Sequence, residues 1–257
     1  MTRLASEVQI VDFVQAARAD NRPFEIVAGG TRRAVGRPMG DLVVADVGGL
    51  SGIVKYQPEE LVLTVLPGTS LSDIKSVLAA KNQCLGFDPV CWSFLDASTR
   101  GEAATTIGGA ISADASGSGR LRHGAARDSL LGFRGVNGFG EAFSAGSKVV
   151  KNVTGFDLPK LVCGAFGTLC VLTELTFRVY PKAKYSATIA MKNVAPDEGF
   201  AALRKIWHSA LEPTGLAYLP KDSTALVRFE AAQQPLREKC AAAILRRMER
   251  GLGNQRT

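Results

Sequence analysis

The sequence is poor in the residues that build metal centres. Its 257 residues include two histidines and five cysteines, and no two cysteines stand in a Cys-x-x-Cys spacing. Zinc sites and iron–sulfur clusters use closely spaced cysteine and histidine ligands, so we expect no metal site. The cysteines are instead expected to be buried, reduced thiols. They are Cys84, Cys91, Cys163, Cys170 and Cys240.

Long apolar runs are absent too. No stretch reaches the ~18 apolar residues of a membrane span. Residues 1–15 also lack the apolar region of a signal peptide. We therefore expect a cytoplasmic protein without a membrane span.

Unbroken runs of one charge are lacking as well. The chain carries 31 basic and 24 acidic residues, a formal net charge of +7. This surplus would suit an anionic ligand or a nucleic acid. The basic residues form no continuous run and do not alternate with aromatic residues, so we expect a solvated surface and no nucleic-acid partner.

The spacing of apolar residues predicts an α+β chain with a boundary near Pro181. In the first part, helices are expected at Glu7 to Ala19 and at Ser70 to Lys81, where Ser70 is the N-cap. Short strands and turns lie between and after them, and a hairpin turns at Asn137-Gly138. A last strand, from Leu169 to Tyr180, alternates at period two before Pro181. The predicted domains are therefore residues 1–182 and 183–257.

The second part has a β-α-β-β-α pattern. The expected elements are a strand at 184–192, a helix at 196–211, strands at 215–219 and 224–230, and a helix at 235–250. This order is that of a split βαβ, ferredoxin-like domain without its last strand.

The segment Thr106 to Gly124 reads TIGGAISADASGSGRLRHG, and about half of the 27 glycines lie between Gly101 and Gly167. Such a cluster indicates either a loop-rich structural region or a backbone that follows a ligand closely. The common nucleotide loops do not fit. Gly146-Ser147-Lys148 has the wrong order for a Walker loop, and Arg122 stands where the dinucleotide fingerprint needs glycine.

Two further small-residue turns follow predicted strands: AGGT at 28–31 and LPGT at 66–69. Backbone N–H groups in such turns form concavities that bind anions. Together with the segment after Thr106, they could line one elongated ligand, such as a pyrophosphate-linked dinucleotide.

Five stretches in order resemble one known family. They are AGGT, LPGTSLSDI, LGFDP, TIGGAISADASGSGRLRHGAARDSLLGFRGVNGFGE and VVKNVTGFDLPKLVCGAFGTLCVLTELTFRVYP. This series, from about Phe24 to Pro181, resembles the FAD-binding subunit of bacterial glycolate oxidase, a flavoprotein of the vanillyl-alcohol oxidase (PCMH-type) superfamily. The resemblance implies a PCMH-type FAD-binding domain of two α+β subdomains, followed by an incomplete ferredoxin-like cap.

The resemblance also implies residues that hold FAD. Gly29, Gly30 and Thr31 would wrap the pyrophosphate. The other positions would contact the phosphates, the ribityl chain, the flavin or the adenosine end: Pro67, Gly68, Thr106, Gly108, Gly109, Ser112, Ser116, Gly117, Gly167 and Val171. The segment AGGTRRAVG has neither the histidine nor the cysteine that attaches flavin covalently in some members, so non-covalent FAD is expected.

The implied activity is oxidation of glycolate or a similar 2-hydroxy acid. Electrons would pass through FAD to a partner iron–sulfur subunit, in a complex with a related flavoprotein subunit that could bring the chain to the inner membrane. The alternative is a flavin-binding assembly or electron-relay subunit without substrate turnover. Because the family's subunit is longer, this chain is expected to be a truncated or frame-altered version.

The catalytic residues stay open. An arginine would suit the substrate carboxylate, and a base would accept the hydroxyl proton. Arg32 and Arg33 could neutralise phosphate or face solvent. Lys151 and Asn152 could touch flavin or substrate, or form a turn. The remaining candidates are Arg120, Arg122 and Arg127 for the carboxylate and His123 for the base, although a lone histidine is more often structural.

Overall fold

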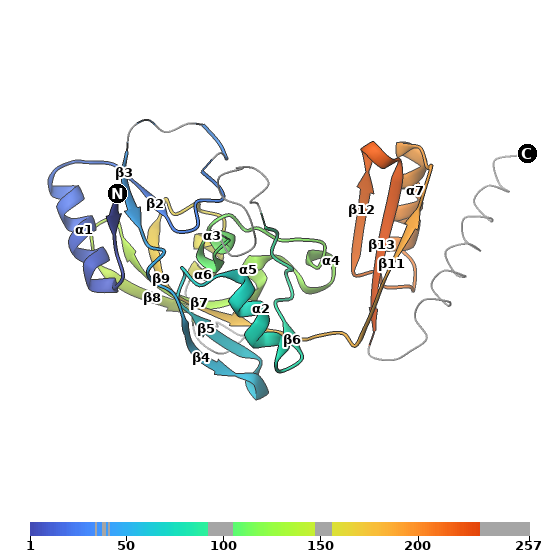
Figure 1. Ribbon diagram of the computed structural model, residues 1–257, viewed down its shortest axis with the longest axis horizontal. Coiled ribbons are helices and arrows are strands. Elements are labelled where there is room, and N and C mark those ends of the chain that lie inside the picture. Colours follow the sequence, from blue (N-terminus) through green and yellow to red (C-terminus); the bar gives the residue numbers. More distant parts are fainter. Residues whose placement is uncertain (34, 38–39, 41, 92–104, 147–155, 232–257) are drawn as a thin grey trace, which may run out of the picture. The chain divides into compact units, whose positions relative to one another are not determined.

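The computed structural model describes residues 1–33, 35–37, 40, 42–91, 105–146 and 156–231 (Figure 1). The chain divides into two compact units. Unit 1 comprises Met1–Gly117 and Gly124–Pro181, and unit 2 comprises Ser118–His123 and the residues from Lys182 onward. Both units combine helices with β-sheet, which confirms the predicted α+β class.

The first subdomain of unit 1 is a small parallel sheet with one long helix. Its strands are β1 (Thr2–Arg3), β2 (Phe24–Val27) and β3 (Val43–Asp46), in the order β1-β3-β2. The helix is α1 (Glu7–Ala19), which begins as predicted because the Ser6 side chain accepts a hydrogen bond from the backbone N–H of Gln9. Ile10 and Val14 of α1 are buried in one core with Ala45 of β3.

The second subdomain is built on an antiparallel sheet of order β4-β5-β9-β7-β8. Its strands are β4 (Ile53–Gln57), β5 (Val62–Val65), β9 (Cys170–Arg178), β7 (Leu130–Asn137) and β8 (Ala142–Gly146). The turn between β4 and β5 is the 3-10 turn η1 (Pro58–Glu60), and the predicted hairpin joins β7 to β8.

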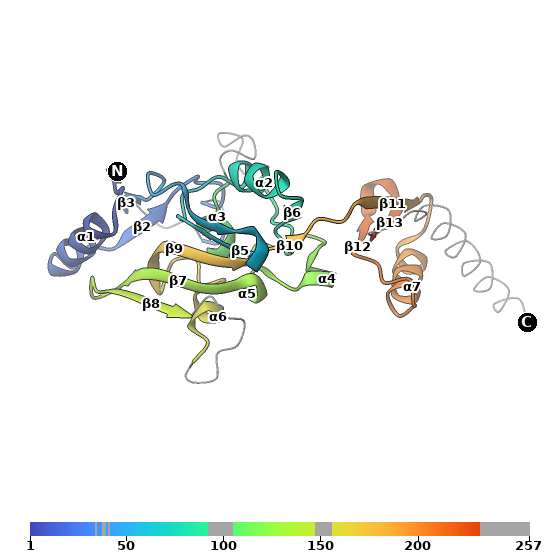
Figure 2. The ribbon, with the colours of Figure 1, turned by 90° about the horizontal axis from the view of Figure 1, so that it is seen from below.

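Helix α2 (Leu71–Ala79) closes the core of the large sheet. As predicted, Ser70 is its N-cap, and the Ser70 side chain accepts from the N–H of Asp73. Leu71, Ile74 and Leu78 are fully buried on its inner face, at the three- and four-residue spacing of a helix. Figure 2 shows the small sheet and α1 beside the β7–β9 part of the large sheet.

The glycine-rich region contains short helices that the sequence pattern did not predict. They are α3 (Ile107–Ser112), α5 (Ala126–Ser129) and α6 (Leu158–Val162). Helices this short are unstable in isolation, so packing within the fold must stabilise them. A two-residue pair, β6 (Gln83–Cys84) with β10 (Tyr180–Pro181), ends the unit.

Unit 2 is a three-stranded antiparallel sheet with one covering helix. Its strands are β11 (Tyr185–Met191), β12 (Gly215–Leu219) and β13 (Thr224–Ala231), in the order β11-β13-β12, with the turn η4 (Pro220–Asp222) before β13. These strands confirm the predicted ones. Helix α7 (Pro196–Trp207) ends earlier than predicted, and helix α4 (Arg120–His123) packs against β12. The predicted helix at 235–250 lies outside the described residues.

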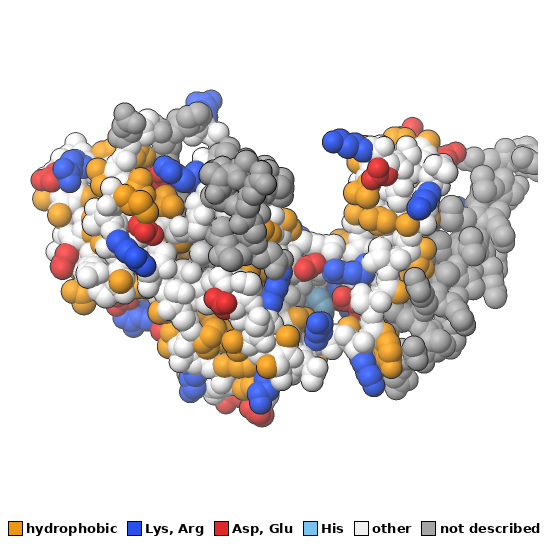
Figure 3. Space-filling view, viewed as in Figure 1, with side chains coloured by type: hydrophobic (Ala, Val, Ile, Leu, Met, Phe, Trp, Pro, Cys, Tyr) orange, Lys and Arg blue, Asp and Glu red, His pale blue; other side chains and the backbone are white. Residues whose placement is uncertain are grey.

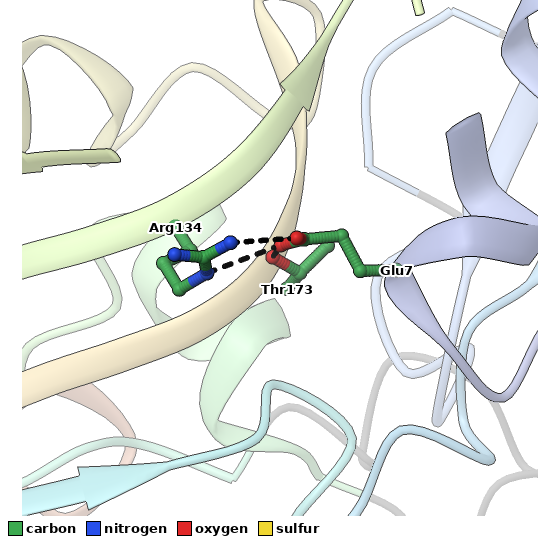
Figure 4. Close-up of polar contacts among 3 residues, drawn as sticks. All are labelled: Glu7, Arg134 and Thr173. Atoms are coloured by element: carbon green, nitrogen blue, oxygen red, sulfur yellow. Dashed lines mark hydrogen bonds and ion pairs between the residues drawn. The ribbon is translucent and has the colours of Figure 1, made fainter. Parts of the chain in front are cut away.

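An ion pair with a hydrogen-bonded threonine joins the two subdomains of unit 1 (Figure 4). Glu7 of α1 accepts from Arg134 of β7, with Nη2–Oε1 at 2.7 Å and Nε–Oε2 at 3.3 Å. The Thr173 hydroxyl of β9 donates to Glu7 Oε2 at 2.6 Å. The hydrogen bond from Arg134 holds the pKa of Glu7 below its ordinary value, so this carboxylate is more stable in the folded chain than in the unfolded chain.

We expect Glu7→Gln to lower the free energy of unfolding at pH 7 by about 1 kcal/mol, because a partly exposed charge-assisted pair is lost. The pKa of Glu7 is depressed in the folded state. The Glu7 carboxylate therefore stabilises the fold fully at pH values above its ordinary pKa of 4.5, and this stabilisation is lost as the pH falls through the folded pKa. Urea unfolding of the original chain and of the Glu7→Gln variant should show that the difference between their free energies of unfolding becomes smaller from pH 7 to pH 3. Glu60→Gln, at an exposed carboxylate of η1, is the control, and a difference that does not vary with pH would contradict the assignment.

Candidate cofactor site

The turn that follows β5 is tied directly to helix α3. The backbone N–H of Gly108 donates to the Pro67 carbonyl at 2.8 Å, and that of Ile107 donates to the Thr69 carbonyl at 3.0 Å. Thr106 is the N-cap of α3, and its hydroxyl accepts from the N–H of Gly109. Two of the predicted turns therefore form one structure with α3 at its centre.

Three of the glycines that were predicted to contact FAD are also needed for close packing within the chain. A Cβ on Gly108 would lie 2.6 Å from Pro67 Cβ, and one on Gly68 would lie 2.7 Å from the Gly48 carbonyl oxygen. A Cβ on Gly117 would lie 2.3 Å from the carbonyl oxygen of Asp88. Since real Cβ atoms do not approach other atoms this closely, these glycines allow backbone to pack on backbone.

The opposite side of α3 is the more open one. Gly109 and Ser112 are half-buried there, one turn of helix apart, whereas Gly108 is buried. The Arg32 guanidinium lies over Gly109, with Nη1 3.0 Å from the position a Cβ would take. This arrangement brings the predicted turn after β2 to the predicted segment after Thr106.

The Arg32 side chain is enclosed at its charged end. Its Nε and Nη2 atoms are shielded from solvent, and burial lowers the pKa of the guanidinium. Thr31 beside it is buried, with its hydroxyl 3.4 Å from Arg32 Nη1. The positive φ of Gly30, 69°, makes the turn that delivers both residues to α3, a conformation that favours glycine.

The neighbouring Arg33 has a different environment. It donates from Nε and Nη2 to the two carboxylate oxygens of Glu25, at 3.0 and 2.7 Å, on the exposed surface. From the sequence, each of the two arginines could either neutralise a phosphate or face solvent. The structure separates them, because Arg33 is neutralised on the surface and Arg32 points inward over α3.

A shielded guanidinium and the N-terminal turn of a helix both carry positive charge. Their proximity at Gly109 makes this side of α3 favourable for an anion. A pyrophosphate fits such a position through charge-assisted hydrogen bonds to arginine and to backbone N–H groups. The residues present thus fit the phosphate portion of FAD.

The loop before β9 continues the site from α3 towards β2. The N–H of Phe166 donates to the Ser112 carbonyl at 2.8 Å. A Cβ on Gly167, which has a φ of 74°, would lie 3.3 Å from Ile26 Cδ1 of β2. The predicted residue Gly167 is therefore close to the strand whose end carries the Gly29-Gly30 turn.

An open pocket of about 750 Å³ extends from this loop. Its lining includes Phe24 and Ile26 of β2, the C-terminal half of α1, the β7–β8 turn and both predicted residues Gly167 and Val171. The Val171 side chain is itself buried in the core with Val136, so the backbone is what this residue can offer to a ligand.

The predicted residues Ser116 and Gly117 lie beyond the C-terminal end of α3. The Ser116 hydroxyl accepts from the N–H of Ala126 at 2.9 Å, and the N–H of Gly117 donates to the Phe87 carbonyl at 2.9 Å. Gly117 thus holds this turn against the LGFDP segment at 85–89, and Ser116 holds it against the start of α5.

The sequence interpretation missed the turn after β3. Gly48 lies between two predicted turns: its Cβ position is 3.7 Å from Ala28 Cα, and its carbonyl contacts Gly68. Asp46 fixes this turn by accepting from the N–H of Gly48 at 2.9 Å. The Gly48-Gly49 pair after a predicted strand was the available signal.

Three of the candidate catalytic residues, Arg120, Arg122 and His123, lie on the short helix α4 of unit 2, and Arg127 belongs to unit 1. Arg122 forms an ion pair with Glu212 at 3.2 Å within unit 2, and Arg120 and Arg127 are exposed. His123 belongs to α4 in the same unit as Arg122, and Lys151 and Asn152 lie outside the described residues.

Among the described residues, no three His, Cys, Asp or Glu side chains are placed to hold a metal ion, and no helix is long and apolar enough to cross a membrane. Burial raises the pKa of the Cys170 thiol to about 11. On the face in Figure 3, Lys and Arg side chains are interspersed with Asp and Glu rather than gathered in one patch.

Fold and site together define an α+β protein that binds an anionic nucleotide cofactor. Residues 2–146 match the family described as "FAD binding domain", which is more than half of the chain. The chain belongs to this FAD-binding family, and FAD is its cofactor.

Two relatives of the chain are subunits of glycolate oxidase. The chain is 31% identical over 224 residues to glycolate oxidase subunit GlcE of Escherichia coli (strain K12), which covers 87% of this chain and 60% of that protein. It is 27% identical to glycolate oxidase subunit GlcD of Bacillus subtilis (strain 168), across 76% of this chain and 39% of that protein. The chain thus spans less than two thirds of the length of each of these relatives.

The fold is also found in solved structures. Alkyldihydroxyacetonephosphate synthase superposes with a TM-score of 0.68 at 17% identity, over 90% of this chain and 46% of that one. At this identity the similarity establishes the fold alone, and it agrees with the predicted α+β class.

We expect Arg32→Gln to weaken FAD binding about 10- to 100-fold, since a charge-assisted hydrogen bond contributes about 1.5–3 kcal/mol. Arg33→Gln is the matched control, because it removes a surface ion pair worth under about 1 kcal/mol. Titration of FAD into each apoprotein, followed by flavin fluorescence, measures both. Equal loss of affinity in the two variants would remove Arg32 from the site.

Gly108→Ala and Gly109→Ala should separate a packing glycine from a binding glycine. The first places a methyl group against Pro67 and should lower the free energy of unfolding by about 1–3 kcal/mol. The second meets the flexible end of Arg32. It should change stability by less than about 1 kcal/mol but weaken FAD binding roughly tenfold. Thermal unfolding without FAD measures the stability of each variant, and FAD titration measures its binding. If Gly108→Ala weakened FAD binding and Gly109→Ala lowered the stability, the Gly108 side of α3 would face the cofactor instead.

Proposed function

We propose that this chain is the FAD-binding subunit of a glycolate oxidase (glycolate dehydrogenase) complex. It oxidises glycolate or a similar 2-hydroxy acid to the 2-oxo acid, and its electrons pass through FAD to a partner iron–sulfur subunit. Residues 1–182 form the FAD-binding domain and residues 183–257 form part of a cap. The observation that carries the proposal is the shielded Arg32 guanidinium over α3, where the small-residue turns converge.

The turn after β2, the helix α3 and the loop before β9 hold different parts of FAD. Arg32, Thr31 and the N–H groups of the Gly29-Gly30 turn bind the pyrophosphate, with Gly109 leaving room for it. The backbone from Gly167 to Val171, along the pocket of about 750 Å³, takes the adenosine end. Ser112 extends the site on the open side of α3 towards the ribityl chain and the flavin.

Bound FAD supplies the hydride acceptor for oxidation of the hydroxyl carbon. The small residues around α3 bring backbone donors close to the cofactor and hold it in one orientation. No described side chain is assigned as the base that accepts the hydroxyl proton, so the catalytic residues stay unassigned.

The cofactor is held without a covalent bond. The segment AGGTRRAVG offers neither histidine nor cysteine. Cys163, whose Sγ donates to the Ile111 carbonyl of α3, is a poor nucleophile, because burial raises the pKa of its thiol far above the ordinary range. Acid precipitation should therefore release the flavin.

The second candidate is a flavin-binding assembly or electron-relay subunit. It is favoured by the ion pair of Arg122 with Glu212, which engages one arginine considered for the substrate carboxylate.

In either case the partners are a related flavoprotein and an iron–sulfur subunit. The proposed location is the cytoplasm, where these partners could hold the chain at the inner membrane.

The purified chain should show a flavin absorption spectrum, and the colour should move to the supernatant after acid precipitation. Anaerobic glycolate should then bleach the bound flavin, whereas acetate, which lacks the hydroxyl group, should not. A visible spectrophotometer suffices for both measurements.

Three results would change the assignment. Flavin that dithionite reduces but glycolate does not would favour the relay subunit. Flavin that stays with the precipitate would contradict non-covalent binding. A colourless chain that takes up no added FAD would remove the cofactor function from this chain.

A further inference from the structure

Helix α4 belongs to unit 2, although the residues on both sides of it belong to unit 1. The chain leaves unit 1 after Gly117 and returns to it at Gly124. The segment between them, Ser118–His123, is therefore part of unit 2 but is far in sequence from the strands of that unit. Because Ser116 and Gly117 directly precede this segment, whatever fixes α4 in unit 2 also acts on two residues predicted to contact FAD.

Both ends of the α4 segment are fixed to the backbone of unit 1. At the first end, the N–H of Gly117 donates to the Phe87 carbonyl at 2.9 Å. At the second end, Gly124 has a φ of 83°, and the Asp128 carboxylate accepts from the N–H of Ala125 at 2.8 Å. A short chain between two fixed ends has little slack, so a displacement of α4 must disturb the hydrogen bonds of these turns.

Two contacts hold α4 in unit 2. Ser118 packs on β12 at Gly215, where a Cβ would lie only 2.9 Å from the Ser118 Cβ. Arg122 forms an ion pair with Glu212, with 3.2 Å between Nη1 and Oε2. The first contact depends on close packing, and the second joins α4 to the turn that precedes β12.

The turn that carries Glu212 has an unusual backbone. Glu212 has a φ of 46°, in the left-handed region that residues other than glycine rarely adopt, and it precedes Pro213, a position that favours extended backbone. Residues 213–215 are buried, and the N–H and hydroxyl of Thr214 both donate to the Arg228 carbonyl. The buried part of the turn therefore keeps the strained residue in place and presents its side chain to α4.

The ion pair itself is exposed, since the side chains of Arg122 and Glu212 are 51% and 67% accessible. Exposed pairs add little to the stability of a whole domain. Their effect is local, on segments that open more easily than the core. Here the local segment is α4, which is one short helix with fixed ends.

We propose that the ion pair of Arg122 with Glu212 is a clasp, which keeps α4 in unit 2 and so holds Ser116 and Gly117 in the conformation that binds FAD. Arg122 and Glu212 are positioning residues, because they act on the cofactor through this segment. If the clasp is broken, FAD dissociates faster. The inference rests on the proposed function in one respect, the contact of Ser116 and Gly117 with FAD, and does not depend on the proposed oxidation.

Charge reversal and charge exchange test the clasp in the full chain loaded with FAD. Arg122→Glu and Glu212→Arg each bring like charges together, and each should raise the rate of FAD dissociation about fivefold. The double variant restores an opposite pair and should return the rate to within about twofold of the original. Asp222→Arg, the same kind of charge change at another exposed position of unit 2, is the control and should leave the rate unchanged. Flavin fluorescence after dilution measures each rate.

Amide hydrogen exchange of the apoprotein tests the same clasp without FAD. The Gly117 N–H should exchange about fivefold faster in both single variants and return towards the original rate in the double variant, whereas the amides of β9 should not change. Faster exchange in β9 as well would assign the effect to the whole fold and overturn the proposal.

Two further results would overturn the clasp. One is FAD dissociation at the original rate in the single variants, or no rescue in the double variant. The other is faster exchange at Gly117 with unchanged FAD dissociation, which would place this segment outside the cofactor site. Failure of glycolate to bleach the flavin would count against the proposed oxidation alone, because neither measurement contains glycolate.

Discussion

The site depends on close contact of backbone with backbone around α3. Gly108 lets this helix rest directly on Pro67, and Gly68 lets the same turn rest on the carbonyls of Gly48 and Leu50. A side chain at either glycine would push these segments apart, since there is no room even for a Cβ. The ends of β2, β3 and β5 can therefore meet at a single short helix, and the side of that helix that carries Gly109 and Ser112 stays more open.

This packing has an electrostatic consequence. It places the Arg32 guanidinium over Gly109, shielded from the solvent that would otherwise screen its charge. A buried cation beside the start of a helix favours an anionic ligand, and the diphosphate of FAD supplies two negative charges. The hydrogen-bonded pair of Glu7 and Arg134 holds α1 against the large sheet and so joins the two subdomains of unit 1.

The sequence predicted the long elements well because their signals are local. The serine cap at Ser70, the periodicity from Glu7 to Ala19, the alternation from Cys170 to Arg178 and the turn at Asn137-Gly138 act within a few residues. It did not predict α3 or α6, because helices of one or two turns have little stability of their own. It also ended α7 too late, at Leu211 rather than Trp207.

The sequence by itself determined the α+β class, the small-residue turns and the family, since these depend on residue type and order. It could not separate Gly108, which packs, from Gly109, which faces Arg32, because the two are adjacent in the same motif. Nor could it separate Arg32 from Arg33, since only the fold puts Glu25 beside one and α3 beside the other. Tertiary structure decided these roles because burial and distance arise from segments far apart in the chain.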